Sequence, residues 1–165
     1  MKSIYLCGFM GCGKSTIGKI LARKNGCGFI DMDDYIVERE EMTIPQIFSE
    51  KGEQYFRSTE TAVIRELSKK NAVIACGGGA MLKKENAEIA SENGIVVYIE
   101  IPFDVCYNRI SGDANRPLVV NNTKEQLEEI YNGRVPVYKS HSTVTVDGVG
   151  SADEIAERIC NAIKY

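Results

Sequence analysis

Short apolar runs alternate with longer amphipathic stretches along the chain. Three runs, SIYLC (3–7), AVIAC (72–76) and IVVYIE (95–100), have almost no interspersed polar positions, which is typical of strands buried on both faces. Two weaker runs, GFID (28–31) and the more polar STVTVD (142–147), each predict one further strand. The apolar pattern therefore predicts five strands.

Helical patterns fill the intervals between these runs. Ile17, Ile20 and Leu21 recur at helical spacing within STIGKILARKN. Residues three apart predict capping boxes at two helix starts: Ser151 with Glu154, and Thr123 with Gln126. The polar, irregular stretch SGDANRPLVVNNT (111–123) predicts a mobile loop. Alternating strands and helices predict an α/β fold, a parallel sheet with helices on both faces.

Composition narrows the possible partners. The 165 residues are enough for one well-packed domain. A net charge of −3 disfavours a broad surface for nucleic acid or anionic membrane, because such surfaces need a basic excess. We expect no signal peptide and no membrane span. The six cysteines form no C-x-x-C pair, so we expect reduced thiols and a cytoplasmic location.

The segment GFMGCGKST (8–16) carries the strongest chemical signal. It matches G-x-x-x-x-G-K-[ST] between a predicted strand and a predicted helix, the context that this motif requires. Its glycines let backbone N–H groups turn toward phosphate oxygens, and the helix start adds the positive end of its dipole. Lys14 can reach the terminal phosphates, and Ser15 can offer a hydroxyl to Mg²⁺. A plain connecting turn is the weaker alternative. The motif predicts a nucleoside triphosphate site and leaves the acceptor open.

Carboxylates follow the second predicted strand. Asp31 and Asp33 stand at its C-terminal end, where ligands gather in open parallel sheets. One interpretation has Asp31 facing a metal and Asp33 facing an acceptor hydroxyl. Capping of the following helix by Asp33 or Asp34 is supported equally well by these residues alone.

Further polar signals have ordinary explanations when each is taken singly. Arg57 and Glu60 are three apart, as in a surface ion pair on a helix. Three consecutive glycines (77–79) permit close approach by a ligand, and they also suit a tight turn. Arg116 and Arg134, each on its own, indicate no more than surface charge.

Taken together and in order, these segments resemble the shikimate kinase family of P-loop small-molecule kinases. The matching segments are GFMGCGKST, DMD, IF…GEQYFR..E, GGGA, RPL and R.P.Y, and they span nearly the whole chain. The resemblance implies a three-layer α/β/α P-loop NTPase fold with a five-stranded parallel sheet in the order 2-3-1-4-5. It implies one domain (1–165), with an acceptor-binding segment at about 31–60 and a lid at about 111–123.

The resemblance also implies an activity and its partners. The activity is the ATP- and Mg²⁺-dependent phosphorylation of the shikimate 3-hydroxyl, a step of aromatic amino acid biosynthesis. The implied partners are ATP and shikimate, with no nucleic acid or membrane, and we expect a monomer.

Residue roles follow from the same resemblance. The residues implied to hold the ATP phosphates are Gly11, Cys12, Gly13, Lys14, Ser15 and Thr16. Those implied to hold shikimate are Asp33, Arg57, Gly78, Gly79 and Arg134, with Phe48 and Phe56 lining the apolar side of the ring. Ser15 would bind Mg²⁺, and Asp31 would reach it through water. Arg116 would come from the lid onto the transferring phosphate, and Arg109 would lie near the adenine. Asp33, Lys14 and Arg116 form the expected catalytic set.

The chain departs from the family pattern after the last strand. Family members often carry an arginine or another adenine-contacting side chain there, whereas DGVGS (147–151) offers mainly backbone. Cys12 also occupies a position that is more often filled by a small residue without a thiol.

Two other function classes remain open. Another P-loop kinase, for gluconate or a nucleoside monophosphate, would share the phosphate loop. A nucleotide-dependent switch without transfer chemistry is the second class, although a guanine switch would need an N-K-x-D element that NNTKE does not supply. The set of Lys14, Asp31, Asp33 and Arg116 argues against a catalytically silent relative.

Overall fold

Five parallel strands form the central sheet in the order β2-β3-β1-β4-β5. The computed structural model describes residues 2–164. The strands are β1 (Ser3–Cys7), β2 (Gly28–Asp31), β3 (Ala72–Ala75), β4 (Gly94–Glu100) and β5 (Val144–Asp147). Both the predicted five strands and the expected strand order are confirmed.

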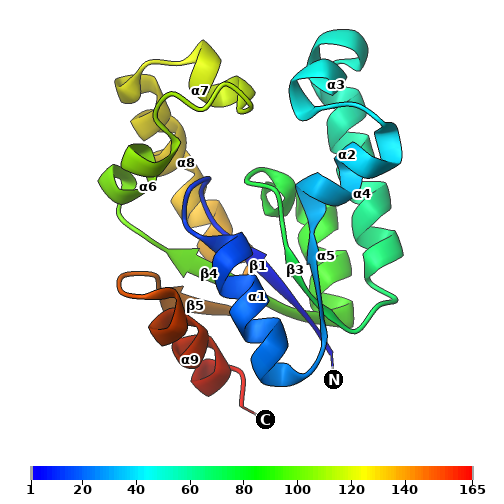
Figure 1. The fold of residues 1–165 in the computed structure, drawn as a ribbon, viewed down its shortest axis with the longest axis vertical. Coiled ribbons are helices and arrows are strands. Elements are labelled where there is room, and N and C mark those ends of the chain that lie inside the picture. The colour runs from blue at the N-terminus through cyan, green and yellow to red at the C-terminus, as the bar shows by residue number, and fades with distance from the viewer. Residues whose placement is uncertain (1, 165) are drawn as a thin grey trace.

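Helices cover both faces of this sheet (Figure 1). The helices of the first half are α1 (Lys14–Asn25), α2 (Met32–Glu40), α3 (Ile44–Lys51), α4 (Glu53–Leu67) and the 3₁₀ turn η1 (Ala80–Leu82). Those of the second half are α5 (Lys84–Asn93), α6 (Phe103–Ile110), α7 (Pro117–Asn121), α8 (Lys124–His141) and α9 (Ala152–Ala162). The α1 and α9 helices pack on each other on one face, while α5 and α8 pack against β4 on the other. Within residues 2–164, no helix combines the length and apolar character that a membrane crossing requires.

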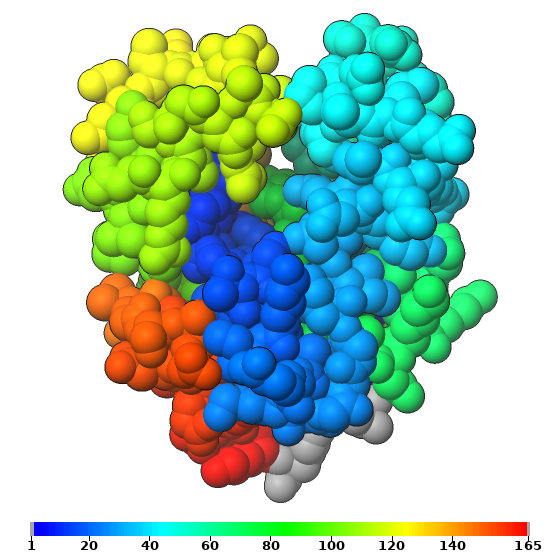
Figure 2. All heavy atoms as spheres, viewed as in Figure 1, coloured from blue at the N-terminus to red at the C-terminus, as the bar shows by residue number. Residues whose placement is uncertain are grey.

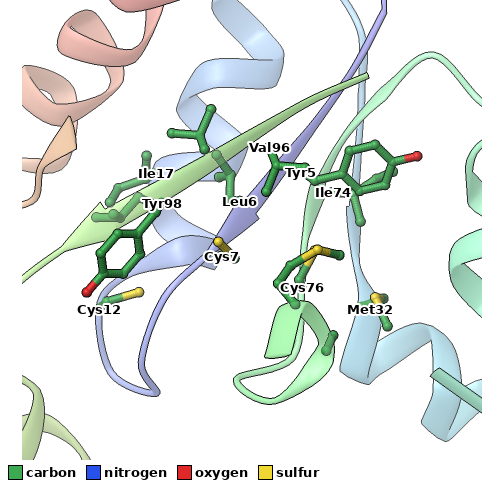
Figure 3. Packing of buried hydrophobic residues seen from close by; sticks show 14 of the residues in the cluster. Tyr5, Leu6, Cys7, Cys12, Ile17, Met32, Ile74, Cys76, Val96 and Tyr98 are labelled. Atoms are coloured by element: carbon green, nitrogen blue, oxygen red, sulfur yellow. The ribbon is translucent and has the colours of Figure 1, made fainter. Parts of the chain in front are cut away.

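The buried strands owe their apolar sequences to these two helical layers. All five residues of β1 are buried, and Tyr5, Leu6 and Cys7 have no exposed surface. Figure 3 shows side chains of β1, β3 and β4 packing on both sides of the sheet. A residue on either face of a central parallel strand meets a helix, so polar alternation disappears. The edge strand β2 is only partly buried, which explains its weaker apolar signal.

Two local predictions need correction. The stretch 111–123 is not irregular throughout, because α7 (Pro117–Asn121) lies within it and begins at a proline, which suits the first turn of a helix. The predicted capping box at Ser151 is only half formed. Ser151 accepts the Glu154 N–H at 3.2 Å, but the Glu154 carboxylate lies 3.8 Å from the Arg158 guanidinium. The box at Thr123 and Gln126 is complete.

The carboxyl ends of the strands meet at one edge of the sheet, and this edge is hollowed. Figure 1 shows α2 and α3 rising on one side of it and α6 and α7 on the other. Figure 2 shows a cleft between these two sides, with the segment after β1 at its floor. Parallel strands bind ligands at this edge because the loops that follow neighbouring strands converge there.

Packing of α1 against the sheet and α9 should dominate stability. Leu21 of α1 is fully buried, so Leu21→Ala leaves a cavity and should lower the free energy of unfolding by about 2–5 kcal/mol. Val120 is 62% exposed, so Val120→Ala is the matched control and should change the free energy of unfolding by less than about 0.5 kcal/mol. Urea unfolding followed by circular dichroism measures both changes. Equal effects would contradict the packing assignment.

Candidate active site

The loop between β1 and α1 exposes the start of a helix to the cleft. Gly8, Gly11 and Gly13 all have positive φ angles, of 152°, 81° and 90°. Gly13 caps α1 without a side-chain hydrogen bond, so the first N–H groups of the helix stay available for an anion. Lys14 folds over the loop, and its Nζ donates to the Gly8 carbonyl at 2.8 Å and to the Phe9 carbonyl at 3.3 Å. The loop therefore has the geometry of a phosphate cradle.

A cavity of about 290 Å³ opens in front of this loop and is called the phosphate cavity here. Its lining includes ten residues expected from the sequence: Gly11, Gly13, Lys14, Ser15, Thr16, Asp31, Asp33, Gly78, Arg109 and Arg116. Cys12 does not line it. Cys12 is buried under the loop, with its Sγ 3.6 Å from Lys14 Nζ. Any contact of residue 12 with phosphate in this cavity would come from its backbone.

Asp31 joins the second strand to this cavity. Its Oδ1 accepts the N–H groups of Asp33 and Asp34 at 3.0 and 3.2 Å, and its Oδ2 accepts a hydrogen bond from the Ser15 hydroxyl. Asp31 is therefore the N-cap of α2, and the alternative of capping by Asp33 or Asp34 is wrong. The reason is positional, because Asp31 ends β2 in an extended conformation and its side chain reaches back over the first turn.

The Ser15–Asp31 pair also fits a magnesium ion. A hydroxyl and a carboxylate are the hard oxygen donors that Mg²⁺ prefers, and Mg²⁺ usually keeps few protein ligands beside water and phosphate. Within residues 2–164, no cluster of three or more histidine, cysteine or acidic side chains is arranged as a metal site. One hydroxyl and one carboxylate suit a metal that also takes phosphate oxygens as ligands.

A second cavity, of about 240 Å³, adjoins the first and is called the acceptor cavity here. Every residue expected to hold the acceptor lines it: Asp33, Phe48, Phe56, Arg57, Gly78, Gly79 and Arg134. Phe48 and Phe56 pack together with centroids 4.9 Å apart, which gives the cavity one apolar wall. The two arginines supply positive charge at the same cavity.

Arg57 is held in place by two acidic side chains. Its Nη1 lies 2.7 Å from Glu60 Oε1, and its Nη2 lies 3.5 Å from Glu53 Oε1. Gly79 makes this arrangement possible, since a Cβ at residue 79 would overlap the Arg57 guanidinium. The glycine run is thus more than a turn, because a backbone without a side chain lets the arginine lie against it.

Asp33 and Arg116 line both cavities, as do Met10 and Gly78. Burial, followed by the neighbouring Asp31 carboxylate, raises the pKa of Asp33, while Lys14 and Arg116 oppose the rise. Arg116 comes from the 111–123 segment, and its Nε donates to Asp113 Oδ2 at 3.0 Å. A carboxylate and a guanidinium therefore stand at the junction between the two cavities.

Glu60 is a deeply buried charged group of this site, with a side chain only 1% exposed. Burial raises the pKa of its carboxyl to about 7, against the opposing effect of Arg57. Asp33 raises this pKa further, whereas Arg134 lowers it. Its Oε2 has no hydrogen-bond partner among the described residues. The i, i+3 spacing had predicted an ordinary surface pair, but the fold buries Glu60 and leaves Arg57 30% exposed at the acceptor cavity.

A third cavity, of about 240 Å³, continues the phosphate cavity past α1. Gly13, Thr16 and Arg109 line both of them. Arg109 Nη1 donates to the Gly11 carbonyl at 2.9 Å, so this side chain lies across the phosphate loop. The other wall comes from α9 and the loop before it: Gly150, Ala152 and Ile155. We call this space the base cavity.

Several residues of the site had no role assigned to them from the sequence, although Tyr138 stands in R.P.Y and Met10 in GFMGCGKST. Tyr138 is fully buried, and its hydroxyl donates to the Gly78 carbonyl, which anchors the glycine run from α8. Met10, Asn115 and Asn121 line the acceptor cavity from the phosphate loop and the 111–123 segment. The spacing of apolar residues does not separate such side chains from core or surface residues, since only the tertiary fold brings them to the cavity.

Comparisons with known proteins identify the family of this chain. The family model described as shikimate kinase matches residues 10–164. A shikimate kinase of Persephonella marina is 45% identical over 139 residues, which cover 84% of each chain. The chain belongs to the shikimate kinase family.

Other members of the family match over almost the full length. A shikimate kinase of Staphylococcus aureus strain JH9 is 38% identical over 162 residues, covering 98% of this chain and 93% of that one. A structure of the shikimate kinase from Acinetobacter baumannii in complex with shikimate superposes with a TM-score of 0.92 at 38% identity. The superposition covers 99% of this chain and 96% of the Acinetobacter baumannii chain. A gluconokinase from Sinorhizobium meliloti, with a TM-score of 0.56 and 21% identity, shares the fold alone.

The pKa of Glu60 predicts a pH-dependent stability. The folded-state pKa of about 7 exceeds the ordinary value of 4.5, so the folded protein binds this proton more tightly than the unfolded chain does. The stabilisation of the folded state by the Glu60 proton is complete below pH 4.5, the pKa of Glu60 in the unfolded chain. It is lost as the pH rises through about 7, the pKa of Glu60 in the folded protein. From about pH 4 to about pH 8, wild type should lose about 3 kcal/mol of unfolding free energy relative to Glu60→Gln, which cannot ionise.

Urea unfolding across this pH range measures the difference. The exposed Glu128→Gln is the matched control, and its difference from wild type should stay flat. A flat difference for Glu60→Gln as well would show that the carboxyl titrates normally in the folded protein.

Proposed function

We propose that this protein is an ATP-dependent shikimate kinase, which transfers the γ-phosphoryl group of ATP to the 3-hydroxyl of shikimate. One observation carries the proposal: a phosphate-binding cavity and an arginine-lined acceptor cavity adjoin and share Asp33 and Arg116. Such an arrangement lets a polyphosphate and an anionic acceptor meet at one carboxylate and one guanidinium. Membership in the shikimate kinase family supports the choice of acceptor.

The acceptor cavity suits a small ring that carries a carboxylate. Arg57 and Arg134 both line it, and a planar guanidinium grips two carboxylate oxygens at once. The Phe48–Phe56 wall matches the apolar face of such a ring. Gly78 and Gly79 let the acceptor approach the backbone closely, and Asp33 accepts hydrogen bonds from ring hydroxyls. We assign all seven residues to acceptor binding.

Phosphoryl transfer requires mainly alignment and neutralisation of charge. Asp33 takes up the proton of the attacking hydroxyl, and the raised pKa makes it a better base than an exposed aspartate. Lys14 and Arg116 place positive charge where negative charge builds on the transferred group. We assign nucleotide binding to residues 11–16 with Arg109 and Arg116, residue 12 contributing only its backbone.

Magnesium is the metal that we propose for this site, held by Ser15 and, through water, by Asp31. The bound ion would neutralise phosphate charge during transfer. The Ser15–Asp31 hydrogen bond marks the two oxygen donors that would turn to it.

The remaining expectations also stay proposals. We retain an acceptor-binding segment at about 31–60 and a lid at about 111–123 within a single domain (1–165). A closed lid would exclude water, which would otherwise hydrolyse ATP in place of transfer to the acceptor. We also retain the cytoplasmic location, the monomeric state, and the absence of nucleic-acid and membrane partners as predictions.

A coupled assay of ADP release tests the function directly. With ATP and Mg²⁺, we expect slow hydrolysis without acceptor and a strong stimulation by shikimate, with shikimate 3-phosphate as product. Gluconate and nucleoside monophosphates serve as alternative acceptors in the same assay. Stimulation by gluconate but not by shikimate, or binding of nucleotide without any phosphorylated product, would overturn the proposal.

Asp33→Asn tests the role of the shared carboxylate. Turnover with shikimate should fall by about 10²–10⁴-fold, because an amide cannot take the proton, while ATP affinity stays nearly intact. Asp34→Asn is the matched control, since Asp34 is the exposed neighbour on the same helical turn. Near-normal turnover of Asp33→Asn would remove this residue from the mechanism.

A further inference from the structure

The loop that follows β5 forms one wall of the base cavity although it carries no large side chain toward it. Residues 147–151 read DGVGS, and of these only Gly150 lines the cavity. The opposite wall is formed by Arg109 and Thr16. Because the base cavity continues the phosphate cavity, a nucleotide held by the phosphate loop would have its base against this backbone.

A loop with two glycines has many conformations to lose, so its shape must be imposed by other residues. Part of the restraint is internal to the sheet, since the Gly148 N–H donates to the Glu100 carbonyl at 2.8 Å. The Val149 N–H donates to Asp147 Oδ1 at 2.9 Å, which closes a short turn. These two bonds hold the first half of the loop.

Arg158 of α9 holds the carbonyl side of the same loop. Its Nη1 donates to the Asp147 carbonyl at 2.9 Å and also to the Val149 carbonyl. Its Nη2 lies 3.8 Å from Glu154 Oε2, the carboxylate that does not return to its capping position. One guanidinium nitrogen thus bridges both carbonyls of the turn, while the other Nη lies near a carboxylate.

The Arg158 and Glu154 side chains lie next to Gly150, the loop residue that lines the base cavity. Gly150 has a φ of 122°, and a Cβ there would come within 2.5 Å of Glu154 Oε2 and 3.4 Å of Arg158 Nη2. Arg158 is not among the residues that line the cavity. Arg158 therefore bonds the loop without itself lining the cavity, whereas Gly150 of the loop does line it.

We propose that Arg158 is a positioning residue for nucleotide binding, which holds the loop 147–150 in the conformation that receives the base of ATP. It acts through the loop carbonyls and not by touching the nucleotide. The inference rests on the proposed function for the assignment of ATP to these cavities. DGVGS offers no large side chain for the adenine to contact, so the adenine would contact the backbone of this loop, and Arg158 keeps that backbone in place.

Arg158→Met tests this role by separating base binding from phosphate binding. Titration calorimetry measures the affinity for ATP and for inorganic tripolyphosphate, which occupies the phosphate loop but has no base. The Kd for ATP should rise about tenfold, because both hydrogen bonds that hold the loop are lost and ATP must then order the loop itself. The Kd for tripolyphosphate should change less than about twofold. Arg39→Met is the matched control. Arg39 is similarly exposed and bonds one carboxylate, but it lines none of the three cavities.

Arg158→Lys gives a second, milder variant. An ammonium can still donate to the loop carbonyls but lacks the planar fork, so the rise in the Kd for ATP should lie between those of wild type and Arg158→Met. If Arg158→Met does not fold, this variant decides alone, and an ATP affinity equal to that of wild type would overturn the proposal. The melting temperature of each variant is recorded alongside.

Three results would refute the positioning role. They are an unchanged Kd for ATP, an equal loss of affinity for ATP and tripolyphosphate, and a lower melting temperature with an unchanged ratio of the two affinities. The measurement needs no acceptor. A failure here therefore leaves shikimate phosphorylation standing, and a failure to phosphorylate shikimate leaves the nucleotide measurement valid. A wild-type protein that bound no ATP would overturn both.

Discussion

The parallel alignment of β1, β2 and β3 is the constraint on which the whole site depends. These strands are adjacent in the sheet, so the segments that leave their carboxyl ends emerge side by side. The phosphate loop follows β1, Asp31 ends β2, and the glycine run follows β3. A sheet with another strand order would carry the same three segments without bringing a phosphate cradle, a carboxylate pair and an acceptor wall together.

Charge is the second problem that the fold must solve. The site collects acidic side chains, among them Asp31, Asp33 and Glu60, although both proposed ligands are anions. Each carboxylate has a partner that limits the repulsion: Ser15 and helix N–H groups for Asp31, Lys14 and Arg116 for Asp33, and Arg57 for Glu60. A protein of net charge −3 can in this way present focused positive charge at one cleft.

Glycine backbone forms part of the proposed nucleotide site at both of its ends. The phosphate end meets the start of α1, and the base end meets Gly150. Backbone recognition needs glycine for access, and glycine costs conformational order. In both loops, basic side chains restore that order. The phosphate loop is anchored by Lys14 and Arg109 reaching its carbonyls, and the loop after β5 by Arg158. The same device, a cation bonded to loop carbonyls, therefore appears at both ends of the cavity system.

Much of this protein could be predicted from its sequence because the relevant interactions are local. Continuous apolar runs predicted β1, β3 and β4, since a strand covered on both faces admits few polar residues. The phosphate loop was predictable because it is one contiguous segment whose glycines have one conformational purpose. The N-cap of α2 was not, because Asp31, Asp33 and Asp34 are equally good caps until the end of β2 is known.

Only the tertiary structure decided which distant residues share a cavity and which groups are buried. Glu60 and Arg57 show the same i, i+3 spacing as many surface pairs, yet Glu60 is buried and Arg57 lies against the glycine run some twenty residues further along the chain. Arg158 and the loop before α9 illustrate the same limit, since a bond from a guanidinium to a carbonyl leaves no trace in residue type. Short-range patterns follow from backbone geometry, whereas pKa values, burial and cavity walls depend on neighbours that only the completed fold brings into contact.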